Sequence, residues 1–249
     1  MGHEGPHDDF VNRAVRYMTD ARERLVVPTR VRFELKRKAW HVLGATGAVP
    51  VLLVLPLLWA VAFALFTMGV VIVAYLVERR RRLVMHPLEE TLQNTVVRVL
   101  KETRRKEEAF PWASVLFLTS LILIALGSAY LKVPLAYAFA AFGILGMGDA
   151  ASAIIGIAYG KTRIPWNPRK SLEGTVAGIV VGYFTAILLA SVYYAAAGQV
   201  LPLIMFGVCG VGAVAGMLLE SLPRVQDNFV IPVGAWTSMV AVAALTGVL

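Results

Sequence analysis

Long apolar runs without charge constrain the fold of this chain more than any other feature. From Trp40 to Val77 no Asp, Glu, Lys or Arg occurs, and this run is longer than the about 20 residues that a helix needs to cross a bilayer. Only 16% of the residues are charged and 58% are hydrophobic, whereas about 25% of a typical globular chain is charged. We therefore predict an all-α polytopic integral membrane protein.

We place seven transmembrane helices by the limits of the apolar runs. Their approximate ranges are 40–55, 57–77, 111–131, 134–159, 171–197, 200–219 and 230–249. Pro56 separates the first two, and Pro50 together with Pro56 leaves open whether the first helix crosses the membrane or re-enters on the same side.

Basic residues set the predicted orientation. Every Lys and Arg except Lys132 lies in one of four segments: the N-terminal segment, the loop between the second and third spans, the loop after the fourth span and the loop after the sixth span. With seven spans, all four segments lie on the same side of the membrane. By the positive-inside rule that side is cytoplasmic, so the N-terminus is cytoplasmic and the C-terminus is outside. The chain thus divides into a basic N-terminal segment, 1–39, and a membrane domain, 40–249, with a basic cytoplasmic loop at 78–110.

The same two basic segments carry apolar residues at helical spacing. These residues are Phe10, Ala14, Met18, Ala21 and Leu25 in the first, and Leu88, Leu92, Val96 and Val99 in the second. Amphipathic helices on the cytoplasmic leaflet would explain them, as would packing against each other or a second subunit. In a membrane protein, basic residues usually set the topology or bind anionic lipids. We therefore attribute the net charge of +8 to these roles and expect no nucleic-acid partner. The single cysteine, Cys209, permits no intrachain disulfide and no thiolate metal cluster.

Acidic residues are rare in the second half of the chain and concentrate at one membrane face. Only Asp149, Glu173, Glu220 and Asp227 occur beyond Phe110, and the predicted topology puts them all in or beside the cytoplasmic halves of spans four to seven. A carboxylate near hydrocarbon normally faces a polar cavity or a partner. Carboxylates bind Mg²⁺, while Lys and Arg neutralise phosphate oxygens. The pattern predicts a site for a metal–triphosphate complex, although helix capping or ion pairing would explain any one acid alone.

The segment around the first of these acids contains small residues. Gly146 and Gly148 precede Asp149 directly, and Ser152, Gly156 and Gly160 follow on the same helical face. A break at the glycines would expose backbone N–H groups that suit an anion. The sequence therefore predicts an interruption of this helix, and close packing of two helices is the alternative explanation of the glycines.

A basic loop links this span to the next. Lys161 follows Gly160, but the glycine spacing and the position after a membrane helix exclude a P-loop. Trp166 offers a surface for stacking on a base, and Pro165 and Pro168 stiffen the loop between Lys161 and Lys170.

The remaining acids lie at helix ends. Ser171 is a predicted N-cap with Glu173 in the first helical turn, and capping alone would explain both. Glu220 ends its span, where a carboxylate opposes the helix dipole, so it is the stronger functional candidate. Asp227 and Asn228 begin the last span.

At the entry to the first span, Glu34 is followed by Arg37, Lys38 and His41. The three latter side chains can share one side of a helix at the membrane surface. A topology signal with an interfacial Trp–His pair is the simpler explanation.

In order, these blocks resemble the CTP-dependent prenol and lipid kinases, namely dolichol kinase, phytol kinase and CTP-dependent diacylglycerol kinase. That family belongs to a wider membrane group with the phosphatidate cytidylyltransferases. The resemblance covers residues 34–44 and about 143–232. The motifs are Glu34…Arg37-Lys38…His41, Gly148-Asp149-x-x-Ser152…Gly156-x-x-x-Gly160-Lys161, Lys170-Ser171-x-Glu173-Gly174, and Glu220…Asp227-Asn228-x-x-x-Pro232.

The resemblance implies transfer of the CTP γ-phosphate to a lipid alcohol such as phytol, geranylgeraniol, a dolichol-like polyprenol or diacylglycerol. Asp149 with Glu220 or Asp227 would hold Mg²⁺, and Asp227, Glu173 or His41 would orient or deprotonate the alcohol. The remaining motif residues would bind the nucleotide or the lipid headgroup: Gly148, Ser152, Gly156, Gly160, Lys161, Lys170, Ser171, Gly174, Asn228, Arg37 and Lys38.

The sequence is also compatible with two other functions. A cytidylyltransferase that makes a CDP-lipid is the nearest, although the characteristic C-terminal signature of those enzymes is absent from the sequence. A membrane transporter is more distant, because the acids gather at one face and no repeated half is visible. We expect CTP, a lipid alcohol and membrane lipids as partners, and a homo-oligomer is possible.

Overall fold

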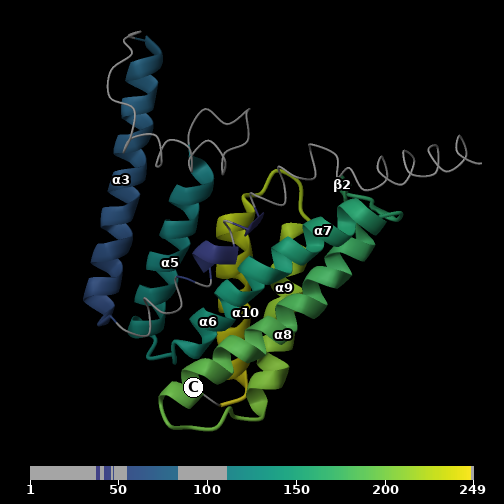
Figure 1. Cartoon of the computed structure of the whole chain (residues 1–249). Helices are drawn as coiled ribbons and strands as arrows, with labels where there is room; N and C mark the ends of the chain where they lie inside the picture. The colour runs from purple at the N-terminus through teal and green to yellow at the C-terminus, as the bar shows by residue number, and fades with distance from the viewer. Residues whose placement is uncertain (1–37, 40–41, 46, 48–54, 84–110, 248–249) are drawn as a thin grey trace, which may run out of the picture. The chain divides into compact units, whose positions relative to one another are not determined.

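The computed structural model describes residues 38–39, 42–45, 47, 55–83 and 111–247. The predicted amphipathic helices, almost all of the N-terminal segment and most of the basic loop lie outside these residues, as does most of the predicted first span. Within the described residues the chain is mostly helical (Figure 1). The helices are α3 (Leu57–Leu83), α5 (Trp112–Tyr130), α6 (Ala136–Gly143), the π-helical segment η1 (Ile144–Gly148), α7 (Asp149–Tyr159), α8 (Leu172–Ala196), α9 (Ile204–Glu220) and α10 (Asp227–Leu245).

Five stretches of helix are long and apolar enough to cross a membrane. They are Leu57–Val77, Trp112–Tyr130, Ala136–Tyr159, Leu172–Ala196 and Asp227–Leu245, and their limits agree with five of the predicted spans to within four residues. The predicted span at 200–219 corresponds to α9, an apolar helix of 17 residues, which is shorter than the usual spanning length.

The stretch formed by α6, η1 and α7 is the central helix. Of its most apolar window 72% is buried within the protein, against 11% for α3, and every residue of α6 is buried. Helices α8 and α10 both pack against it, α9 packs between them against both, and α3 packs on α5 at the periphery. The polar residues of the central helix are therefore enclosed by other helices.

The two glycines before Asp149 do not break this helix, contrary to the interruption expected from the sequence. The chain passes through one π-helical turn, and the backbone N–H of Asp149 donates to the carbonyl of Ile144. That N–H group is therefore not presented to an anion. Gly148 instead allows close packing of two helices, because a Cβ at this position would lie 3.1 Å from the carbonyl oxygen of Gly178 in α8.

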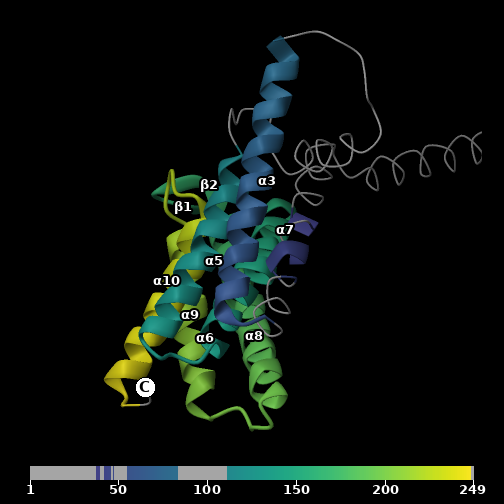
Figure 2. The ribbon, with the colours of Figure 1, turned by 90° about the vertical axis from the view of Figure 1, so that its left-hand side faces the viewer.

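A small antiparallel hairpin joins α7 to α8, so the all-α prediction is incomplete. Strand β1 (Arg163–Ile164) pairs with β2 (Asn167–Ser171), with Arg163 opposite Ser171. The hairpin lies at the end of α7 and α8 that is opposite the connection between α8 and α9 (Figure 2). The Ser171 side chain then caps α8 by accepting from the backbone N–H of Gly174, as its position in the sequence predicts.

Candidate functional site

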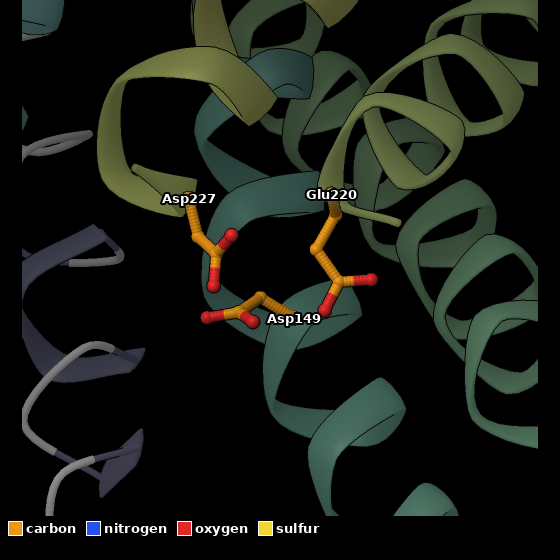
Figure 3. Close-up of side chains that lie close together, drawn as sticks. All are labelled: Asp149, Glu220 and Asp227. Atoms are coloured by element: carbon orange, nitrogen blue, oxygen red, sulfur yellow. The ribbon is translucent and has the colours of Figure 1, made fainter. Parts of the chain in front are cut away.

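Three of the four acids singled out in the sequence converge. Asp149, Glu220 and Asp227 each offer one carboxylate oxygen, and these oxygens all lie within 4.8 Å of one another. Figure 3 shows the three side chains directed into one common space from three different helices. Glu220 is the last residue of α9 and Asp227 the first of α10, so the short connection between these helices brings both acids to one end. Asp149 follows the π-helical turn of the central helix.

Two lysines neutralise part of this cluster. The Nζ atom of Lys38 forms an ion pair with Asp149, and the Nζ atom of Lys170 forms one with Oε1 of Glu220. Lys170 Nζ also lies 3.7 Å from Oδ2 of Asp227. Lys38 comes from the first membrane-proximal segment and Lys170 from strand β2, so segments far apart in sequence meet at the acids.

Three of these five charged groups are buried. Asp149 and Glu220 are buried, with 0% and 1% of their surfaces exposed, and Lys38 is 4% exposed. At an effective dielectric constant of about 20, two like charges at such separations repel by roughly 3 kcal/mol. The two lysines leave an excess of one negative charge among the five groups. This balance favours a further cation.

Lys170 remains an ammonium group in this environment. Burial lowers its pKa, but the negative charges of Asp227 and Glu220 outweigh that effect, and the net result is a raised pKa.

Ser152 completes the surroundings of Glu220. Its hydroxyl lies 3.3 Å from Oε1 and 3.2 Å from Oε2 and donates to this carboxylate. Ser152 belongs to α7, one turn after Asp149. The predicted shared face of Asp149 and Ser152 is therefore directed toward the acids of α9 and α10.

The hairpin is hydrogen-bonded to the residues directly after Glu220, the last residue of α9. Trp166 Nε1 donates to Ser221 Oγ at 3.1 Å, and Asn167 Nδ2 donates to the carbonyl of Ser221 at 3.2 Å and to that of Leu222 at 3.4 Å. Carbonyl groups at a helix C-terminus lack hydrogen-bond donors within the helix, and the hairpin supplies a donor through the Asn167 side chain. Lys170 follows three residues after Asn167, which places its ammonium group against Glu220.

Sequence reasoning missed this role of Trp166, Asn167 and Ser221. The only signal was a turn-forming Asn between Pro165 and Pro168, which indicates a turn but not what the turn contacts.

Glu173 does not join the cluster. Its carboxylate accepts from the backbone N–H of Thr162 at 2.9 and 3.2 Å, across the base of the hairpin. This contact closes the loop between α7 and β1 and agrees with the structural explanation rather than with a role among the other acids.

The other predicted binding residues fall into two groups. Gly156 and Gly174 form the crossing of α7 and α8, where a Cβ on Gly174 would lie 2.6 Å from the Ser152 carbonyl oxygen, and Gly160 packs against Ser171 there. Asn228 Nδ2 donates to the Ala113 carbonyl at 2.7 Å, which fastens α10 to α5.

Lys161 is exposed beside the hairpin and so remains accessible to an anion. Arg37 and His41 lie outside the described residues.

The donor set fits a hard divalent cation. Mg²⁺ prefers carboxylate oxygens and commonly binds proteins through one or two carboxylates together with substrate phosphates. The three carboxylates supply such ligands, and the lysines beside them are suited to phosphate oxygens. The arrangement can therefore hold a cation and an anionic substrate together at the end of a helix bundle.

About a third of this chain is similar in sequence to two plant phytol kinases. Phytol kinase 1, chloroplastic, of Arabidopsis thaliana is 35% identical over 91 residues, which cover 34% of this chain and 29% of the relative. Probable phytol kinase 1, chloroplastic, of Glycine max is 37% identical over 95 residues, covering 34% of this chain and 30% of the relative. The match thus spans less than a third of either kinase. No solved structure matches the chain.

A family model described as the cytidylyltransferase family matches residues 33–224. This range includes the lysines Lys38 and Lys170 and two of the three clustered acids, Asp149 and Glu220. Together with the phytol kinases, the match confirms the resemblance to the CTP-dependent prenol kinase group. Because the matched range covers more than half of the sequence, this chain belongs to the cytidylyltransferase family.

Proposed function

We propose that this protein is a CTP-dependent kinase that transfers the γ-phosphate of CTP to the hydroxyl of a membrane lipid alcohol. The observation that carries the proposal is the convergence of Asp149, Glu220 and Asp227 with Lys38 and Lys170 at one end of an apolar helix bundle. Phosphoryl transfer depends on positioning and charge neutralisation more than on covalent chemistry, and this cluster offers both. The similarity to phytol kinases supports the same reaction class.

The reaction is an in-line displacement. The alcohol oxygen forms a bond to the γ-phosphorus, the bond between that phosphorus and the β,γ-bridging oxygen breaks, and CDP leaves with the bond electrons. The hydroxyl proton passes to a carboxylate, for which Asp227 is the best-placed acid because it is the most exposed of the three, at 23% of its side chain. Lys170 and Lys161 bind phosphate oxygens, and Lys38 keeps the Asp149 carboxylate in place.

Asp149 and Glu220 would hold Mg²⁺, which leaves Asp227 for the hydroxyl proton. When bound, the ion supplies neutralisation of the charge that develops on the phosphate oxygens. Lys170, which pairs with Glu220 and lies near Asp227, would move to a phosphate oxygen if a divalent cation took its place beside these acids.

The proposed topology has seven spans with the N-terminus and the acid cluster on the cytoplasmic side. The alternation of basic segments supports it. CTP then approaches from water through the hairpin end, while the alcohol approaches from the bilayer between helices. Phytol is the proposed first substrate to assay, since the relatives are phytol kinases.

A cytidylyltransferase is the second candidate, favoured by the family description. That enzyme would join the CMP part of CTP to a lipid phosphate and release pyrophosphate. The same acids and lysines would serve either reaction, since both handle a triphosphate.

The proposal is tested with purified protein in mixed micelles that contain phytol, CTP and Mg²⁺. CDP formation should require the alcohol, stop upon chelation of the metal, and be lost in Asp149→Asn. If CDP forms at the same rate with Asp149→Asn, or forms equally without alcohol, the proposed function is wrong.

A further inference from the structure

Thr175 carries a buried hydroxyl that the site described above does not use. It is the fourth residue of α8, and only 5% of its surface is exposed. Its Oγ1 atom has no hydrogen-bond partner among the described residues. A buried hydroxyl without a partner costs roughly 1–3 kcal/mol, so its retention calls for an explanation.

Other threonines in the described helices satisfy their hydroxyls locally. Thr67, Thr119, Thr185 and Thr237 each donate to the carbonyl of the residue four positions earlier, at 2.8 Å in every case. This is the usual solution for threonine in an apolar helix. At Thr175 the corresponding carbonyl is that of Ser171, and no such bond forms. The hydroxyl of Thr175 is therefore available to a group outside its own helix.

The packing of α8 on α9 places Thr175 at the level of Glu220. Gly178 packs directly against Met217 of α9 and against Ser152 of α7. The two helices run in opposite directions (Figure 1), so one turn toward the hairpin leads from Gly178 back to Thr175 and from Met217 forward to Glu220. Residues three apart share a helix face. Thr175 and Glu220 consequently lie on neighbouring faces at the same end.

The charge of the surroundings selects the kind of ligand. Thr175 lies within the apolar span of α8 at the level of Glu220, and α8 carries no Lys or Arg, so a phosphate bound to Thr175 would have no cation from that helix to neutralise it. A neutral hydroxyl needs no such cation. A hydroxyl can also both donate to and accept from threonine.

We propose that Thr175 binds the hydroxyl group of the lipid alcohol and so positions its oxygen beside the acid cluster. This inference rests on the proposed function, because it assigns the acceptor subsite of that same site. If Thr175 binds the hydroxyl group, the protein should bind a lipid alcohol more tightly than a hydrocarbon of the same shape.

Direct binding of tritiated phytol without nucleotide tests the inference, with the full chain purified in lipid nanodiscs. Thr175→Val removes the hydroxyl and keeps the shape, Thr175→Ser restores the hydroxyl, and Thr185→Val is the matched control in the same helix. We expect Thr175→Val to weaken phytol binding roughly fivefold to tenfold, the effect of one neutral hydrogen bond. Thr175→Ser and Thr185→Val should stay within about twofold of the wild type.

A competition arm gives a readout that a structural role would not change. Unlabelled phytol should displace the label better than phytene, the hydrocarbon without the hydroxyl, and Thr175→Val should remove that preference. The thermal unfolding temperature of Thr175→Val should equal or exceed that of the wild type, because no bond within the protein is lost.

Three results would overturn the inference: unchanged phytol binding in Thr175→Val, a loss of CTP binding in its place, or no phytol binding by the wild type. The proposed function fails separately. If wild-type protein binds phytol through Thr175 but transfers no γ-phosphate to it, the subsite stands and the kinase reaction does not.

Discussion

Lys170 Nζ forms an ion pair with Glu220 and lies 3.7 Å from Oδ2 of Asp227, so one ammonium group links the end of α9 to the start of α10. These acids are separated by a short connection, and like charges held this close would drive the two helix ends apart without a cation between them. The lysine reaches them from the β-hairpin, which is itself bonded to the residues directly after α9. The hairpin is therefore a part of the site.

Replacing Glu220 should abolish activity without unfolding the protein. Glu220→Gln keeps the size of the side chain but removes a charge from the proposed cation site, and we expect kcat to fall by at least about a hundredfold, as for loss of one preorganised electrostatic contact. CDP release from CTP and phytol measures it. Glu173→Gln is the control, because Glu173 contacts only the hairpin backbone in the described structure. Equal losses in both variants would contradict the assignment.

Removing Lys170 should destabilise the protein through the acids that it leaves behind. Breaking a buried ion pair costs roughly 3–5 kcal/mol, but 27% of the Lys170 side chain is exposed, so we expect a smaller loss of about 1–3 kcal/mol for Lys170→Met. The double variant Lys170→Met/Glu220→Gln should be more stable than Lys170→Met alone, since it also removes an uncompensated carboxylate. Thermal unfolding in detergent measures both. Strict additivity of the two changes would contradict the pairing.

The contact between the hairpin and α9 should affect catalysis from a distance. Asn167→Ala removes the amide that donates to the Ser221 and Leu222 carbonyls, and we expect a fall in stability of about 1 kcal/mol together with a lower kcat. Arg169→Ala is the control on the same strand, with an exposed side chain. If Arg169→Ala lowered kcat as much as Asn167→Ala, charge on the hairpin rather than its attachment would be the cause.

The glycine crossing of α7 and α8 should tolerate no added methyl group. A Cβ on Gly174 would lie 2.6 Å from the Ser152 carbonyl oxygen, and we expect Gly174→Ala to cost roughly 1–3 kcal/mol and to displace Ser152 from Glu220. Gly207→Ala in α9 is the matched control, because nothing lies within 4 Å of a Cβ there. Unfolding temperatures that fall equally would show that helix flexibility, not the crossing, matters.

Of the seven membrane helices that the sequence predicts, five are long and apolar enough to cross a membrane, and three of the four acids predicted to lie at one face meet. The five helices follow the limits of the apolar runs, and the positive charges between the runs predict one common membrane face for Asp149, Glu220 and Asp227. Glu220 in particular stood out, because a carboxylate at a helix C-terminus opposes the dipole.

Contacts between distant segments were beyond the sequence. Nothing in the local pattern pairs Lys38 with Asp149, since packing of the helices decides that approach. The π-helical turn at Ile144–Gly148 was missed because glycines permit both a break and a close contact. The sequence places Glu173 near the same membrane face as the other acids. In the structure, its carboxylate instead accepts a hydrogen bond from the backbone N–H of Thr162 at the base of the hairpin.

The central claim is tested most directly with CTP that carries its label on either the α- or the γ-phosphate. The purified protein is incubated with each donor, phytol and Mg²⁺, and the label in the extracted lipid is counted, with Asp149→Asn as the inactive control. The account predicts that only γ-label reaches the lipid, with CDP as the other product. Label from the α position in a lipid product, accompanied by release of pyrophosphate from CTP, would contradict it.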